Sequence, residues 1–338
     1  MRIQVHKTTV PAIAVFALLA GTLPLAAQEK PDRPPWAQPS GTQPSKPAAE
    51  PPQQKSQEQT SSRNTVKVNV NLVTVLVSVL DEHNRPAPNL PIEAFQVLEE
   101  GVPQKIDVFE SETKLPLDIA LMIDASLSAH REKATEQGAA SHFIQQVLRP
   151  DDRLAVFAFD ESVTQVAPFS ADVLGLQSAV RRIPDGAGTS IYDAVLLGSK
   201  ALEKRSGDHR RVIIMVTDAG ETTSRTDFDS ARKAALRAGI LLYTIVIRPV
   251  RNENGRNTAG EHALQTITDT TGGAMFFPES SQELPIIFDR IDSELRTQYR
   301  LAYYPNPRGP ASTYRTIEVK ILPGYTARHR TTYLTGPQ

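Results

Sequence analysis

Residues 117–128 read LDIALMIDASLS, an apolar run that ends in alternating polar side chains. The run from Leu117 to Ile123 has the composition of a buried strand. Asp124, Ser126 and Ser128 follow it at every second position, where the strand should end. Their oxygen atoms can point at one place, which is how proteins hold a hard cation.

Downstream of this run, apolar strand patterns alternate with patterns of helical spacing. Such alternation is typical of parallel strands joined by right-handed crossovers, with helices on both faces of one sheet. The sequence therefore predicts a doubly wound, mostly parallel, Rossmann-like α/β fold. The predicted strands cover 119–123, 154–159, 212–217, 241–247 and 274–277, and the predicted helices cover 140–148, 173–183, 191–204, 228–238, 260–269 and 282–296.

Strand patterns also flank this α/β region. On the amino-terminal side, alternation starts at Val66 and an apolar run continues to Val79, and on the carboxyl-terminal side the patterns cover 299–304, 316–321 and 327–334. We expect the two flanks to pair with each other in a small β-sandwich into which the α/β domain is inserted. The predicted domains are an N-terminal β segment at 65–112, the α/β domain at 115–297 and a C-terminal β segment at 298–335.

The beginning of the chain is typical of export. Residues 1–27 combine Arg2 and Lys7 with an apolar run and a small-residue end, which predicts a cleaved signal peptide. An uncleaved anchor is disfavoured because the run is shorter than the ~20 apolar residues of a spanning helix. Residues 28–64 are rich in Pro, Gln and Ser, which predicts a disordered linker. We expect a periplasmic or secreted protein without stable membrane insertion after cleavage.

Composition excludes several classes of function. The chain has 338 residues, 40% of them hydrophobic, so it can close a sizeable core. Its 37 basic and 38 acidic residues give a net charge of -1, which leaves no broad basic surface for nucleic acid. There is no cysteine, so disulfides, thiol catalysis, thiolate metal sites and a lipid-attached cysteine are excluded.

Two further positions complete a candidate site. Thr189 lies in the glycine-rich stretch 186–190 ahead of a predicted helix, and Asp218 follows the predicted strand 212–217. Because loops at the carboxyl ends of parallel strands meet at one edge of the sheet, we expect Thr189 and Asp218 to lie near Asp124.

With these five positions the chain resembles von Willebrand factor type A (VWA) domains over roughly residues 115–297. Asp124-x-Ser126-x-Ser128, Thr189 and Asp218 match the metal-ion-dependent adhesion site (MIDAS) of that family. The flanking segments resemble those of exported bacterial proteins with a VWFA-related domain, on residues 72–80, 95–97, 303–304 and 314–320.

The resemblance implies a function as well as a fold. Ser126, Ser128 and Thr189 would bind the ion directly, and Asp124 and Asp218 directly or through water. Oxygen ligands suit Mg²⁺, with Mn²⁺ or Ca²⁺ as alternatives, and the lack of cysteine and of a nearby histidine pair argues against zinc or copper. We expect a non-enzymatic protein that captures an exposed Asp or Glu of a partner protein, with no catalytic residue and no organic cofactor.

One residue departs from the family pattern. The family commonly has glycine after its last aspartate, whereas Ala219 stands here and glycine follows one position later. We therefore expect the loop to turn one residue later than in the family.

Other interpretations stay open. Ser/Asp-rich turns are often helix caps. A metal-dependent phosphatase or hydrolase could use Asp124 as its nucleophile, although such enzymes normally need a second acid two residues on, where Ser126 stands. A third possibility is a structural or assembly factor of the cell envelope, with the β-sandwich as its contact surface.

Overall fold

A computed structural model describes residues 72–111, 114–126, 133–247 and 258–336. The predicted signal peptide at 1–27, the predicted linker at 28–64 and Ser128 lie outside the described residues. The described residues belong to one compact unit that spans Val66–Gln338. None of the helices in the described ranges is long and apolar enough to cross a membrane.

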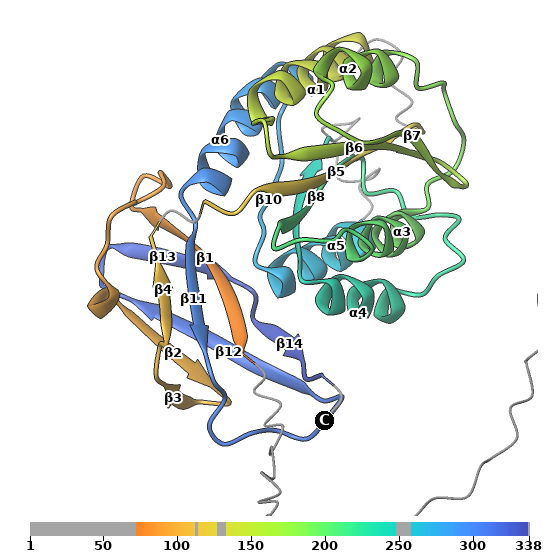
Figure 1. Ribbon diagram of the computed structural model, residues 1–338. Helices are drawn as coiled ribbons and strands as arrows, with labels where there is room; N and C mark the ends of the chain where they lie inside the picture. The colour runs from red at the N-terminus through yellow and green to blue at the C-terminus, as the bar shows by residue number, and fades with distance from the viewer. Residues whose placement is uncertain (1–71, 112–113, 127–132, 248–257, 337–338) are drawn as a thin grey trace, which may run out of the picture. The chain divides into compact units, whose positions relative to one another are not determined.

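A six-stranded sheet with the order β10-β9-β8-β5-β6-β7 forms the centre of the α/β region (Figure 1). The first five strands in this order are parallel, and the edge strand β7 is antiparallel to β6. The strands are β5 (Leu117–Asp124), β6 (Arg153–Phe159), β7 (Val163–Ser170), β8 (Arg210–Thr217), β9 (Ile240–Val246) and β10 (Met275–Phe276).

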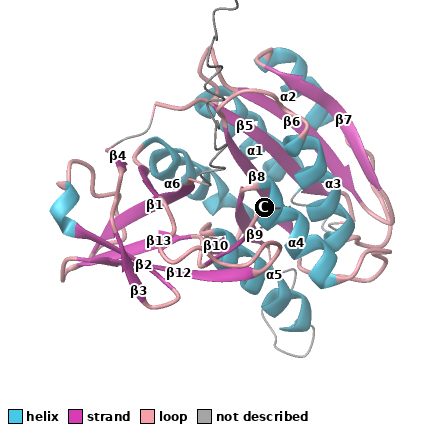
Figure 2. Cartoon of the chain, turned by 60° about the horizontal axis from the view of Figure 1, so that its bottom comes forward, coloured by secondary structure: helices cyan, strands magenta, loops and turns pink. Residues whose placement is uncertain are grey.

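Helices cover both faces of this sheet, which explains why β5 is apolar at nearly every position. Its odd-numbered residues pack against α1, α2 and α6, and its even-numbered apolar residues pack against α3, α4 and α5 (Figures 1 and 2). The helices are α1 (Lys133–Val147), α2 (Val173–Arg181), α3 (Ile191–Glu203), α4 (Phe228–Ala238), α5 (Thr258–Thr271) and α6 (Leu284–Arg296), which follows the short 3₁₀ turn η4 (Ser281–Glu283).

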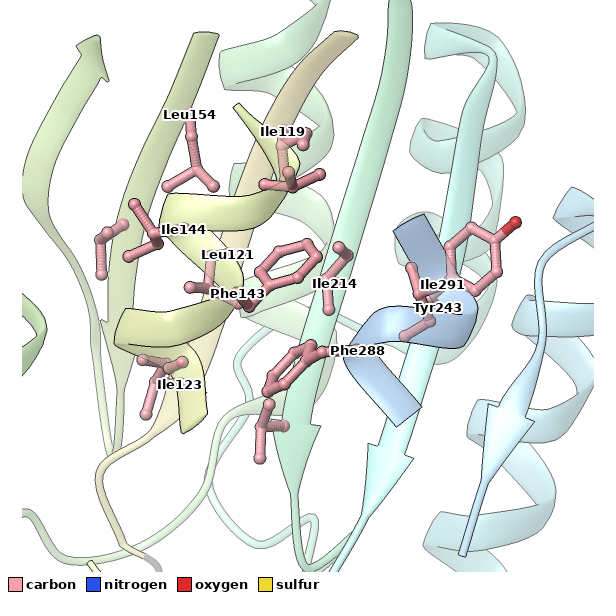
Figure 3. Close-up of a cluster of buried hydrophobic side chains, with 14 of the residues drawn as sticks. Ile119, Leu121, Ile123, Phe143, Ile144, Leu154, Ile214, Tyr243, Phe288 and Ile291 are labelled. Carbon is pink, nitrogen blue, oxygen red and sulfur yellow. The ribbon is translucent and has the colours of Figure 1, made fainter. Parts of the chain in front are cut away.

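The core beneath α1 and α6 holds α6 on the sheet. Phe143 of α1 and Phe288 of α6 stack with their ring centroids 4.7 Å apart, and both contact the apolar face that includes Leu121 (Figure 3). Tyr243 of β9 lies in the same cluster and donates a 3.0 Å hydrogen bond to Glu294 of α6.

The flanking strands form two antiparallel four-stranded sheets with the orders β13-β1-β11-β4 and β14-β12-β2-β3. Strands from before and after the α/β region pair with each other, for example β1 with β11 and β2 with β12. The predicted fold class is confirmed. The strands are β1 (Val73–Asp81), β2 (Phe95–Glu99), β3 (Val102–Gln104), β4 (Val108–Glu110), β11 (Tyr299–Tyr303), β12 (Tyr314–Ile321), β13 (Tyr325–His329) and β14 (Thr332–Leu334), with the 3₁₀ turn η2 (Ile92–Ala94) between β1 and β2.

Two elements differ from the sequence prediction. The single strand predicted over 327–334 is two strands, because the chain passes at Arg330 and Thr331 from the sheet of β1 to the sheet of β12. The edge strand β7 was not predicted. It contains Pro168, which an edge strand tolerates because one side of its backbone needs no partner.

The chain enters and leaves the α/β region through neighbouring strands. β4 precedes β5 and pairs with β11, and β11 follows α6 after only Thr297 and Gln298. The Gln298 side chain donates a 3.1 Å hydrogen bond to Ser78 of β1, so the exit from α6 is fastened to the β-sandwich.

Candidate metal centre

The register of β5 and β8 brings two aspartates to one edge of the sheet. Ile123 is opposite Val216 in parallel pairing, so Asp124 lies beside Thr217 and Asp218 follows one position later. The loop before α3 reaches the same edge, since the amide of Gly186 donates a 2.9 Å hydrogen bond to the carbonyl of Ala125.

Ser126 connects Asp124 with Thr189. Its Oγ donates to Asp124 Oδ1 at 2.6 Å and lies 2.6 Å from Thr189 Oγ1, while its backbone amide donates to the same Asp124 Oδ1 at 3.0 Å. Because the single proton of Ser126 Oγ goes to the carboxylate, the Thr189 hydroxyl is the donor to Ser126. Asp124 and Thr189 are only 2% and 4% exposed. The structure thus gathers Asp124, Ser126 and Thr189 in one group of oxygen atoms, of which Ser126 is the most exposed.

Asp218 adds a second carboxylate. It is half-buried at the end of β8, and its Oδ1 accepts a 2.8 Å hydrogen bond from the amide of Gly220. Burial raises the pKa of Asp124 to about 6, hydrogen bonds from Ser126 and Thr217 oppose that rise, and the charge of Asp218 adds to it. Two neighbouring carboxylates repel each other, so a cation between them would stabilise both.

Thr217 also belongs to this group and was not among the predicted ligands. Its Oγ1 donates a 2.6 Å hydrogen bond to Asp124 Oδ2 and accepts a 3.1 Å bond from the amide of Ala219. Both oxygen atoms of Asp124 are therefore held by hydrogen bonds. The available signal was a polar residue at the end of the apolar β8 pattern, directly before Asp218.

The loop after Asp218 corrects one expectation. Ala219 itself adopts the left-handed conformation, with φ 64°, so the turn comes at the position where the family has glycine and not one residue later. This conformation costs a non-glycine residue roughly 1–2 kcal/mol. The hydrogen bonds that Thr217 and Asp218 accept from residues 219 and 220 hold the turn, and the fully buried Ala219 packs in the core beneath α3 and α4.

Glu221 ties this loop to the start of α3. Its Oε2 accepts hydrogen bonds from the amide of Ile191 at 2.7 Å and from Ser224 Oγ at 2.8 Å, and its Oε1 accepts from the amide of Ser224 at 2.9 Å. The next residue, Thr222, accepts from the amide of Thr189 at 2.9 Å and donates its own amide to the carbonyl of Thr189, also at 2.9 Å. The loop after β8 therefore positions Thr189.

Four of the five predicted ligands, Asp124, Ser126, Thr189 and Asp218, lie together at the carboxyl end of the sheet, and Ser128 lies outside the described residues. All the atoms of this group that could bind a metal ion are carboxylate or hydroxyl oxygens. In the described part of the chain, no group of three or more His, Cys, Asp or Glu residues is arranged to hold a metal ion. A metal here would thus depend on the hydroxyl groups as well as on the two carboxylates.

Residues 119–221 match the family model of the von Willebrand factor type A domain. This region of the chain is therefore similar to the VWA domain family. Domains of this family are often metal-dependent modules for protein interaction.

Solved structures similar to this chain include a von Willebrand factor type A protein from Catenulispora acidiphila, with 12% identity over 80% of this chain and 76% of that one and a TM-score of 0.48. An aerotolerance-related membrane protein from Bacteroides fragilis is 16% identical over 53% of this chain and 98% of that one, with a TM-score of 0.42. The proximal thread matrix protein 1 of the mussel byssus, solved with a zinc-occupied MIDAS motif, is 15% identical over 58% of this chain and 49% of that one, with a TM-score of 0.47. The comparison with curated proteins gave no match.

Proposed function

We propose that this chain is a non-enzymatic binding protein that uses a divalent ion, with Mg²⁺ as the first choice, to capture an exposed Asp or Glu of a partner protein. The proposed ligands are Asp124, Ser126, Ser128, Thr189 and Asp218. The observation that carries the proposal is the hydrogen-bonded contact of Ser126 with both Asp124 and Thr189, beside the charge of Asp218.

The donor set fits such an ion. Carboxylate and hydroxyl oxygens are hard ligands that suit Mg²⁺, Mn²⁺ and Ca²⁺. Asp124 and Asp218 together balance a divalent charge, and the hydroxyls add none. A bound ion would supply an electrophilic centre for one carboxylate from outside the chain.

The surrounding residues keep the ligands in place without binding the ion. Thr217 holds the second oxygen of Asp124, and Glu221 with Thr222 holds the loop that carries Thr189. Ligands fixed in advance lose less conformational freedom on binding. Within the described residues, the rim is formed by loops 160–163, 186–190 and 219–226, which we propose determine the choice of partner.

The proposed location is the periplasm or the cell exterior, after cleavage of residues 1–27. The support is the charged start, the apolar run and the small-residue end of that segment. The proposed membership in the exported VWFA-related bacterial group rests on the flanking β segments, which pair around the α/β domain.

The phosphatase alternative has weaker support. Asp124 is only 2% exposed, which leaves little room for a substrate to approach it as a nucleophile must be approached. The second acid of such enzymes is absent from the position of Ser126.

Metal binding is tested first, by calorimetric titration of the chelator-treated protein with Mg²⁺ and Mn²⁺. We expect one saturable site in the wild-type protein and none in Asp124→Ala or Thr189→Ala. Asp229→Ala, which removes an exposed carboxylate of α4, should bind normally. A wild-type protein that takes up neither ion, or site variants that bind as well as Asp229→Ala, would refute the proposed site.

Partner capture is tested by a pull-down from envelope extract, with and without EDTA, beside Asp124→Ala. A protein band lost both with EDTA and in the variant would tie capture to the ion. A partner band that is retained both with EDTA and in the variant would instead favour the structural role. Phosphatase turnover on a generic substrate would favour the enzyme.

A further inference from the structure

A second pocket lies at the opposite end of the central sheet from Asp124. It has a volume of about 320 Å³ and is bordered by β1 and β11 on one side and by the beginnings of β8 and β9 on the other. Arg210, at the start of β8, is opposite Leu117 at the start of β5. Seven residue steps along β5, about 23 Å at strand rise, separate this end from Asp124.

Positive side chains dominate the pocket wall. It contains four arginines against one acid, Asp208; the arginines are Arg210, Arg211, Arg300 and Arg330. Arg300 is neutralised by Glu110, whose Oε2 accepts from its Nε at 2.9 Å. None of the other three arginines forms an ion pair with a carboxylate in the part of the chain that the structure describes.

Neutral oxygens are the partners of two of these arginines. Arg211 donates to the carbonyls of Ala238 at 3.0 Å and Arg205 at 3.3 Å, and Arg210 donates to the carbonyl of Leu115 at 2.9 Å. Carbonyl oxygens satisfy the guanidinium protons and leave the positive charge in place. The pocket therefore has an excess of positive charge, although the whole chain has a net charge of -1.

Arg330 packs against an aromatic ring. It lies between β13 and β14 with its guanidinium 5.5 Å from the centre of the Tyr333 ring, and its Nε is buried without a hydrogen-bond partner among the described residues. No carboxylate of the described residues neutralises the charge of this guanidinium, so an incoming anion would stabilise it.

Direct backbone packing holds Arg330 in the wall. The amide of Thr331 donates a 3.2 Å hydrogen bond to the carbonyl of Thr270 at the end of α5. Gly272 follows with φ +87°, and a Cβ atom there would lie only 2.4 Å from the nitrogen of Arg330. The β13–β14 junction and the end of α5 are therefore in close contact, which fixes this side of the pocket.

We propose that this pocket binds a small oxyanion, a phosphate or carboxylate group, with Arg330 and Arg211 as its charged donors. The planar guanidinium group matches both kinds of anion with paired hydrogen bonds. The volume suits a small organic acid or phosphate compound and is too small for a folded partner.

The test is calorimetric titration of the chelator-treated chain with inorganic phosphate and, separately, with succinate, at ionic strength held constant with chloride. We expect saturable binding of at least one probe. Phosphate alone would identify a phosphate group as the ligand chemistry, and succinate alone a carboxylate. No saturable binding of either probe above the chloride control would overturn the proposal.

Substitutions in the pocket wall test whether the anion binds there. Arg330→Met should weaken it by roughly tenfold or more, since a charge-assisted hydrogen bond is lost, and Arg211→Met should weaken it in the same direction. Arg181→Met, which removes an exposed arginine of α2, and Asp124→Asn, at the other end of the sheet, should bind as the wild-type protein does. Equal affinity in Arg330→Met and Arg181→Met would refute the assignment.

If Arg330→Met does not fold, NMR of the wild-type protein tests the same assignment. The Nε–Hε NMR signal of Arg330, assigned as the one missing from the conservative Arg330→Lys variant, should shift with the added anion and saturate. An unchanged signal at saturating phosphate and succinate would contradict the proposal as clearly as a failed titration.

Discussion

Thr217 donates a 2.6 Å hydrogen bond from its Oγ1 to Oδ2 of Asp124, and the two residues end neighbouring parallel strands. Thr217 also accepts the amide of Ala219, so one hydroxyl links the carboxylate to the loop that follows Asp218. The carboxyl ends of β5 and β8 are therefore coupled by side-chain bonds as well as by the sheet.

The first prediction concerns this hydroxyl. Thr217→Val keeps the shape of the side chain but leaves Asp124 Oδ2 and the buried amide of Ala219 each without a partner. We expect a loss of about 1–3 kcal/mol of unfolding free energy, measured in urea. Thr164→Val, at an exposed position of β7, is the matched control and should change stability little. Equal stability of the two variants would contradict a structural role for the Thr217 hydroxyl.

The second prediction concerns Glu221. Glu221→Ala removes the acceptor for the first amides of α3, so we expect a stability loss of about 1 kcal/mol, as for a lost helix cap. Because this loop also holds Thr189, Mg²⁺ affinity in calorimetry should fall several-fold while one binding site remains. Glu203→Ala, at the exposed end of the same helix, should leave the affinity unchanged. Unaltered affinity in Glu221→Ala would show that the loop does not position Thr189.

The third prediction compares two glycines with positive φ. Gly101→Ala, at φ +76° with open space around it, should cost only the roughly 1–2 kcal/mol of the left-handed conformation. Gly272→Ala adds a methyl group 2.4 Å from the nitrogen of Arg330 and should cost a further ~1–3 kcal/mol. Urea unfolding of both variants measures the difference. Equal losses would mean that the contact between α5 and the β13–β14 junction is loose.

The fourth prediction is a pH dependence. His329 Nε2 accepts the amide of Val319 at 3.1 Å, while Nδ1 lies 2.8 Å from the carbonyl of Arg330 and must carry the proton of the neutral ring. Burial lowers the pKa of His329, and the bond to Arg330 and the charge of Glu318 only partly oppose this. The unfolded chain therefore binds a proton more readily than the folded chain, so this residue makes stability fall as pH drops through about 6.5 and below.

The comparison that isolates this effect is urea unfolding of the wild-type protein and His329→Gln at pH 7.5 and pH 5.5. Asp124 acts in the opposite direction, because its pKa, raised to about 6, makes stability rise as pH falls toward 4. Asp124 contributes equally to the pH dependence of both proteins, so its contribution cancels in the difference between them. We expect acidification to cost the wild-type protein more stability than the variant. An identical pH dependence would exclude His329 as a source.

Much of the fold could be predicted because β5 and β8 are buried on both faces and read as continuous apolar runs. The helices between them show their apolar stripes clearly, and α4 has the predicted bounds, with Gly239 at its end. β7 was missed because a half-exposed edge strand with Pro168 has neither a continuous run nor a strict alternation.

At the site, the sequence alone identified the side chains that have an unusual spacing. It did not identify the side chains that hold them in place by hydrogen bonds. Asp124 and Ser126 stand out because polar residues alternate where a strand ends. Thr217 resembles any strand threonine until the register places it beside Asp124. An alanine in a sequence does not indicate a left-handed turn. The conformation of Ala219 could therefore be seen only in the structure.

The pairing of β4 with β11, which places the entrance and the exit of the α/β domain side by side, also determines how a mechanical load would travel. A pull between the two ends of the described chain would load the pairing of β1 with β11 and β13 at one end and the pairing of β14 with β12 at the other. The α/β domain would stay outside that path until these strands separate. A load on the two ends of the described chain would therefore leave the geometry around Asp124 relaxed.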